Sequence, residues 1–146
     1  MSALAAGMML QVSLFAAGPQ TYEQAQKQAT ADGLPLLVLV GTDWCPGCRT
    51  MKDSVLPRMA SRGRLDRVSY ANVNAEDESE LASHLMRGGA IPQLIVFSKR
   101  PDGEWHREQI TGSASEAQVV ALIERARAAQ QAKSVMRQAS AAVAGK

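Results

Sequence analysis

The feature that most constrains the fold is an unbroken apolar run, Leu36 to Val40, in the first third of the chain. It has the length of a strand and offers no polar side chain to solvent, which predicts a strand buried on both faces of its sheet. Helices must then cover both faces. The first helix is expected from Tyr22 to about Asp32, because Thr21 and Gln24 form a capping box and Gly33 follows as a stop signal.

Helical and strand patterns alternate along the rest of the chain. They predict, in order, a helix from the cysteine pair to about Ser61, a strand in 67–75, a short helix in 77–89, a hairpin of 92–100 with 104–111, and a final helix. Pro57 should kink the second helix, because proline lacks the N–H and clashes with the previous turn. The final helix should begin with a capping box of Ser113 and Glu116. This order predicts an α/β fold, a central mixed β-sheet flanked by helices, with a C-terminal helical extension.

The length of 146 residues suits one domain, which we expect at 19–128. Residues 1–18 form an apolar leader whose core is too short to span a bilayer and fits a secretory signal, so we expect a periplasmic or otherwise exported protein. The lack of Lys or Arg in the leader, and Pro19 after the expected cleavage site, leave a cytoplasmic protein as the alternative. Residues 129–146 form a basic tail rich in Ala and Gln, for which a frayed helical extension is favoured over a partner helix.

Composition excludes two classes of function. The net charge is +2 and aromatic residues make up 4% of the chain, without a basic block that interleaves with aromatics, so we expect no nucleic-acid partner. Two cysteines cannot build a disulfide scaffold. They can form one redox pair, or half of a metal site.

The two cysteines, Cys45 and Cys48, lie three residues apart at the expected junction of the strand and the second helix. With Cys45 as the N-cap, Pro46 falls at the first helical position, which favours proline, and Gly47 follows it. The Cys45 sulfur would then accept hydrogen bonds from first-turn N–H groups and face the positive end of the helix dipole. Both effects lower the pKa of the Cys45 thiol. We therefore expect an exposed, attacking Cys45 and a more buried Cys48 that resolves the mixed disulfide.

Two other interpretations of the pair remain open. A zinc site would need two further ligands, and neither His84 nor His106 lies at zinc-finger spacing from the cysteines. A non-catalytic module that binds a partner protein, or Cu(I) through the two thiolates, is the alternative to an enzyme. Redox chemistry is favoured because a Cys-x-x-Cys pair in a strand-to-helix context is typical of it. It needs no metal site and no cofactor besides the cysteine pair itself.

The residues that follow the apolar run resemble the thioredoxin superfamily, over about Tyr22 to Ala128. Trp44 and the two cysteines match the W-C-x-x-C motif of that family, and Ile91-Pro92 matches its Ile-Pro. In the family this bond is cis, the proline faces the cysteine pair, and the backbone before it pairs with the bound peptide. Gly112 matches a glycine of the same groove.

The resemblance implies roles for these residues. Cys45 and Cys48 would be catalytic, whereas Trp44, Ile91, Pro92 and Gly112 would bind substrate and Pro46 and Gly47 would support the motif. Trp44 could equally serve only in packing. The chain would act as a monomer on disulfides or dithiols of protein substrates and exchange electrons with an upstream redox partner.

The stretch from Cys45 to Pro57 is most similar to exported thioredoxin-like domains that resemble the C-terminal domain of the bacterial transmembrane disulfide reductase. A reductant is therefore favoured, although Pro46, between the two cysteines, also resembles the motif of oxidases and glutaredoxins. Two departures stand against the pattern of thioredoxin: its buried aspartate falls on Leu39, and the lysine that partners it falls on Asn72. The proton-shuttle assignment of the family therefore does not transfer to these positions.

Overall fold

The computed structural model describes residues 18–144, and side chains as far as Gln131 and Ala132. The leader predicted at 1–18 thus lies outside the described residues except for Gly18. The elements are α1 (Tyr22–Asp32), β1 (Leu36–Gly41), α2 (Pro46–Thr50), the π-helical turn η1 (Met51–Val55), α3 (Leu56–Ser61), β2 (Ser69–Asn74), α4 (Ser79–Leu85), β3 (Gln93–Lys99), β4 (Trp105–Thr111) and α5 (Glu116–Ala144).

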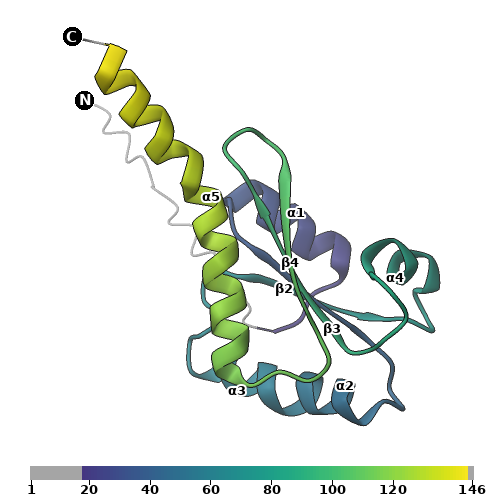
Figure 1. Cartoon of the computed structure of the whole chain (residues 1–146). Coiled ribbons are helices and arrows are strands. Elements are labelled where there is room, and N and C mark those ends of the chain that lie inside the picture. The colour runs from purple at the N-terminus through teal and green to yellow at the C-terminus, as the bar shows by residue number, and fades with distance from the viewer. Residues whose placement is uncertain (1–17, 145–146) are drawn as a thin grey trace, which may run out of the picture.

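The sheet has the strand order β2-β1-β3-β4 (Figure 1). β1 pairs with β2 in parallel and with β3 in antiparallel orientation, and β4 adds an antiparallel edge. The predicted α/β fold with a mixed sheet is therefore confirmed.

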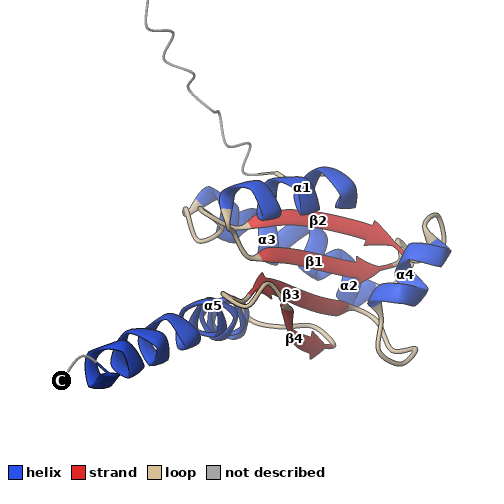
Figure 2. Cartoon of the chain, turned by 90° about the horizontal axis from the view of Figure 1, so that it is seen from above, coloured by secondary structure: helices blue, strands red, loops and turns tan. Residues whose placement is uncertain are grey.

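β1 is buried along its whole length, as its apolar run predicts. Its side chains alternate between two cores. Leu37 and Leu39 pack with residues of η1, α3 and α5, whereas Leu36, Val38 and Val40 pack with residues of α1 and α4. Every side chain of the run therefore lies in a core, and helices cover both faces of the strand. Figure 2 shows α1 along β2 on one side of the sheet and α5 on the other side.

The two ends of α1 follow the prediction. Thr21 and Gln24 form the capping box, with both hydrogen bonds at 3.3 Å. Gly33 ends the helix in the left-handed conformation, at φ 64°.

The second helix contains the predicted disturbance at Pro57 in the form of a π-helical turn. The Leu56 N–H bonds the Met51 carbonyl, five residues back, instead of the residue four back. Pro57 has no N–H, and its ring would clash with the carbonyl of Asp53 in a regular helix. A widened turn directly before the proline avoids that clash and lets the helix continue as α3.

The predicted capping box of the last helix is wrong. α5 begins at Glu116, and the reciprocal hydrogen bonds join Ser115 and Gln118 instead of Ser113 and Glu116. Glu116 instead forms ion pairs with Arg58 in α3 and with Arg62 directly after that helix. Tertiary contacts therefore shift the cap by two residues.

α5 packs on the sheet through its N-terminal half, where Val119, Leu122, Ile123 and Ala126 are buried. The helix continues to Ala144, so it includes most of the segment that the sequence assigns to a tail, and this part projects from the body (Figures 1 and 2). Within residues 18–144, no helix combines the length and hydropathy that a membrane span requires.

Candidate active site

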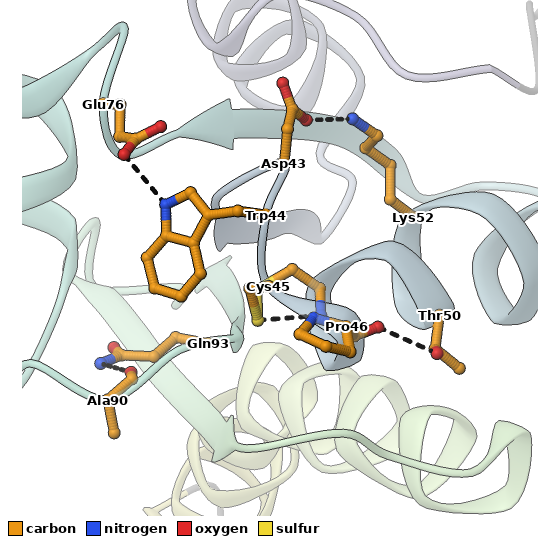
Figure 3. Close-up of a disulfide and its surroundings, with 10 residues drawn as sticks. Asp43, Trp44, Cys45, Pro46, Thr50, Lys52, Glu76, Ala90 and Gln93 are labelled. Carbon is orange, nitrogen blue, oxygen red and sulfur yellow. Dashed lines mark hydrogen bonds and ion pairs between the residues drawn. A yellow bond between two sulfur atoms is a disulfide. The ribbon is translucent and has the colours of Figure 1, made fainter.

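The two cysteines lie at the N-terminus of α2, directly after the loop that leaves β1. Cys45 is the N-cap, and Pro46 occupies the first turn, as predicted. The Cys45 Sγ accepts a hydrogen bond from the Cys48 backbone N–H at 3.2 Å, and the two sulfurs are joined in a disulfide (Figure 3). The prediction that Cys45 is exposed is wrong: it is 7% exposed, against 4% for Cys48. Its sulfur turns toward the first turn of its own helix, where it accepts the Cys48 N–H.

Two glycines allow the disulfide to sit close to its surroundings. A Cβ on Gly41, the last residue of β1, would lie 2.6 Å from the Cys48 Sγ and 2.8 Å from the Cys48 Cβ. A Cβ on Gly47 would lie 2.6 Å from the Ser113 Oγ and 3.4 Å from the Pro92 Cδ. The structure therefore brings Pro92 and Ser113 against the turn that carries the cysteines.

Gly41 and Ser113 are contacts that the sequence prediction missed. A glycine inside a buried strand is a signal for close approach of another group, so Gly41 could have been found. Ser113 has no such signal, because its position follows from how the loop before α5 packs on α2.

The other residues expected at the groove are adjacent to one another. The Ile91–Pro92 peptide bond is cis. Pro92 is buried and Ile91 is partly exposed. Gly112 donates its N–H to the Pro92 carbonyl at 2.8 Å, and its φ of 96° is in the range that favours glycine.

Trp44 precedes the disulfide and does not belong to either core. Its side chain is 66% exposed, and its indole Nε1 donates to the Glu76 Oε1 at 2.9 Å. Figure 3 shows the ring beside Cys45, fixed at its polar end by Glu76. A large apolar surface thus stands next to the disulfide and faces solvent.

Known proteins share the sequence pattern and the fold that carry this geometry. A sequence model of the thioredoxin-like domain matches residues 22–127. The chain belongs to the thioredoxin-like domain family. Among solved structures, a thioredoxin from Thermus thermophilus is 22% identical, with a TM-score of 0.64 over 80% of this chain and 92% of that one.

Other solved thioredoxins give the same result. Chloroplastic thioredoxin z is 20% identical, with a TM-score of 0.58 over 76% of this chain and 94% of that one. A mutant thioredoxin from Halobacterium salinarum is 24% identical, with a TM-score of 0.53 over 75% and 87%. At this identity the likenesses show the fold. A thioredoxin-like fold with a disulfide-forming Cys-x-x-Cys pair supports thiol–disulfide oxidoreductase chemistry at the level of the family.

This thioredoxin-like domain has a hollow of about 270 Å³ beside Cys48. Leu39 and Asn72 line it and are register partners in β1 and β2. These are the two positions at which the superfamily resemblance expects an aspartate and a lysine. Asn72 accepts a hydrogen bond from the Tyr70 hydroxyl. The hollow therefore has neutral side chains at these two positions.

Ionisable side chains also line the hollow, and two of them, Asp43 and Lys52, form an ion pair. The Lys52 Nζ lies 2.7 Å from the Asp43 Oδ1, and the Asn74 Nδ2 donates to the Asp43 Oδ2 at 3.2 Å. The hydrogen bond and charge of Lys52 lower the pKa of Asp43, and Asp43 in turn raises the pKa of Lys52. The two side chains have opposite effects on a nearby thiolate. Because the two are paired, each offsets part of the effect of the other.

Both histidines of this thioredoxin-like domain already form hydrogen bonds with other residues. The His84 Nδ1 bonds the Glu80 carbonyl, and His106 bonds both Arg100 and Glu108. In the described part of the chain, no three His, Cys, Asp or Glu side chains are grouped so that they could hold a metal ion.

Proposed function

We propose that this thioredoxin-like domain reduces disulfide bonds of protein substrates. The observation that carries the proposal is the Cys45–Cys48 disulfide at the N-terminus of α2, with the Cys45 sulfur accepting the Cys48 N–H. A hydrogen bond of this kind and the positive end of the helix dipole favour a thiolate over a thiol. Cys45 is therefore the nucleophile of the reduced protein.

The exchange proceeds in two steps that conserve electrons. The Cys45 thiolate attacks one sulfur of the substrate disulfide, which forms a mixed disulfide and releases the other substrate sulfur as a thiolate that takes a proton. Cys48 then loses its proton and attacks the Cys45 sulfur, which closes the Cys45–Cys48 bond and releases the second substrate thiol. The substrate gains two electrons and two protons, and a dithiol of an upstream redox partner restores the reduced pair by the reverse exchange.

The substrate binds to the surface around the disulfide, next to the residues that the sequence assigns to the groove. Trp44 lies beside Cys45, and Pro92 packs against Gly47 between the cysteines. Ile91 and Gly112 adjoin Pro92, which places backbone groups next to the disulfide for pairing with an extended peptide. Such main-chain pairing accepts many sequences, which fits a reductant of protein disulfides in general.

Two variants test the division of labour between the cysteines. Cys48→Ser should accumulate a mixed disulfide with an oxidised protein substrate, because Cys45 attacks and nothing releases the product. Cys45→Ser should form no adduct. Non-reducing electrophoresis after exposure to oxidised insulin measures both, and adducts on the Cys45→Ser variant would contradict the assignment.

Insulin reduction by dithiothreitol separates the enzyme from a binding module. The proposed function requires the protein to accelerate insulin reduction well above the uncatalysed rate. No acceleration, together with tight binding of Cu(I) by the cysteine pair, would favour the non-catalytic alternative.

The reductant role rests on the resemblance of the Cys45–Pro57 stretch to exported reductase domains. Equilibration with a series of glutathione redox buffers gives the reduction potential of the pair. A potential near the strongly oxidising end of the superfamily would reverse the proposed direction of electron flow.

We also propose that the protein acts in the periplasm or another exported location. The support is the charge-free apolar leader at 1–18. Fusion of residues 1–25 to alkaline phosphatase should give activity above that of a leaderless fusion. Equal activity of the two fusions would place the protein in the cytoplasm.

A further inference from the structure

Gln93, the first residue of β3, is fully buried and lies directly after Pro92. Its Oε1 accepts hydrogen bonds from the Arg87 backbone N–H and the Gln109 Nε2, both at 3.0 Å. Its Nε2 donates to the backbone carbonyls of Arg87 at 3.1 Å, Gly88 at 3.3 Å and Ala90 at 2.9 Å. A primary amide has two lone pairs and two N–H groups, so this side chain uses its full hydrogen-bonding capacity, with one N–H shared between two of the three carbonyls. Figure 3 shows the bond to Ala90 on the side of the disulfide that carries Trp44.

The loop that Gln93 contacts has little other support. Residues 86–92 connect α4 to β3, and the four residues 87–90 within this loop are exposed. In the described part of the chain, no backbone–backbone hydrogen bond outside the helices and strands involves residues 87–91. Gly88, at φ 77°, and Gly89 give this backbone a large conformational freedom. The Gln93 amide therefore takes the place of the missing backbone partners.

Side chains of β4 also hold the Gln93 amide and the loop. Gln109 donates to the Gln93 Oε1 and also to the Thr111 Oγ1 at 2.9 Å. Arg107 donates to the Gln109 Oε1 and, at 2.6 Å, to the Leu85 carbonyl at the start of the loop. Arg107 thus holds the first end of the loop and Gln93 holds its middle and its second end.

We propose that Gln93 is a positioning residue that fixes the loop 87–91 beside the disulfide and thereby sets the affinity for polypeptide substrates. This inference rests on the proposed function. The loop ends at Ile91 and Pro92, and Pro92 packs against Gly47 between the cysteines. A substrate backbone can pair with Ile91 only when the loop has one conformation. If the loop were free, ordering it would weaken each binding event.

Replacement of Gln93 by Met tests this role, because Met keeps the length of the side chain and removes the amide. We expect the KM for insulin to rise about tenfold, as for the loss of one or two net hydrogen bonds, with kcat nearly unchanged. The rate of reduction of hydroxyethyl disulfide, which has no peptide backbone, should stay within about twofold of the wild type. Amide hydrogen exchange at Arg87, whose backbone N–H donates to the Gln93 Oε1, should become faster in the variant.

The matched control is Gln28→Met. Gln28 accepts hydrogen bonds from the Gln20 Nε2 at 2.7 Å and the Ser69 Oγ at 3.3 Å, where β2 begins. This end of the parallel strands is opposite to the end that carries the cysteines, so the same substitution should leave both substrates unaffected.

Three results would overturn the inference: an unchanged KM for insulin, an equal loss for insulin and hydroxyethyl disulfide, or an equal effect of Gln28→Met. If Gln93→Met fails to fold, Gln109→Met decides, because it removes one bond to the amide and should raise the KM for insulin by a smaller factor. A wild-type protein that does not reduce insulin refutes the proposed function itself. An active wild type with an unaffected Gln93→Met variant refutes only the positioning role.

Discussion

Replacement of Gly41 by Ala should destabilise the oxidised protein more than the reduced one. The new Cβ would lie 2.6 Å from the Cys48 Sγ, whereas non-bonded carbon and sulfur atoms need about 3.5–4.0 Å. One side must therefore move by about 1 Å. β1 cannot move easily, because it is hydrogen-bonded to strands on both sides and the Gly41 carbonyl accepts the Ala75 N–H at 2.8 Å. Cys48 is therefore the residue that must move to relieve the clash.

The magnitude follows from the cost of overpacking a buried site, which is about 1–3 kcal/mol. In the oxidised protein the disulfide holds the Cys48 sulfur against Gly41. In the reduced protein that sulfur can rotate away, and only the contact with the Cys48 Cβ, at 2.8 Å, remains. If about 1 kcal/mol of the cost is confined to the oxidised form, the reduction potential rises by about 20 mV, since 30 mV corresponds to about 1.4 kcal/mol for two electrons.

Urea denaturation of both redox forms and equilibration with glutathione buffers measure these two effects. Gly89→Ala is the matched control, because a Cβ on Gly89 meets nothing within 4 Å and its φ is not in the left-handed range. The reasoning is refuted if Gly41→Ala equals this control in stability and potential. An equal loss of stability in both redox forms would refute the part that concerns the sulfur.

Three further predictions concern exposed and buried side chains around the site. Trp44→Ala should raise the KM for insulin several-fold with little change for hydroxyethyl disulfide, whereas Trp105→Ala, which removes the other exposed tryptophan, should change neither. Burial raises the pKa of Tyr70, so the unfolded chain loses the phenolic proton at lower pH than the folded protein does. The free energy of unfolding therefore falls as the pH rises above about 10. Tyr70→Phe should reduce that fall, measured by urea titrations at alkaline pH. Asp43→Asn should shift the pH midpoint of iodoacetamide alkylation of the reduced protein downward and Lys52→Met should shift it upward, and a shift of the same sign in both would contradict their opposing charges.

The sequence was sufficient where a local pattern has one physical outcome. The apolar run of β1 has no polar face, so it could only be buried on both sides. Cys45 and Pro46 fit the N-cap and the first turn of a helix, and the structure places them there. In both cases the residue types and their spacing decide the result without reference to distant parts of the chain.

The start of α5 shows where local pattern is insufficient. Ser113 with Glu116 and Ser115 with Gln118 are overlapping capping boxes of the same kind, and spacing cannot choose between them. Distant residues make the choice: the Ser113 hydroxyl lies against Gly47, and Glu116 pairs with Arg58 in α3 and with Arg62 directly after it. The burial of Cys45 could not be read from its N-cap position either, because distant residues such as Pro92 and Ser113 pack against the cysteine turn at Gly47.

Gln93 is intermediate between features that a local pattern predicts and features that distant residues decide. Its sequence context contains a signal, but arguments from residue spacing do not use it. It is a polar residue directly before four apolar residues of the same strand, and it follows a loop with two adjacent glycines. A buried amide must find hydrogen-bond partners, and a glycine-rich loop without regular structure has unpaired backbone groups to offer. The two needs are complementary, so the amide and the loop satisfy each other, and the conformation of the loop then depends on one side chain. A polar residue at the edge of a buried strand, next to a loop that cannot pair with itself, is therefore a reason to expect a side-chain support for that loop.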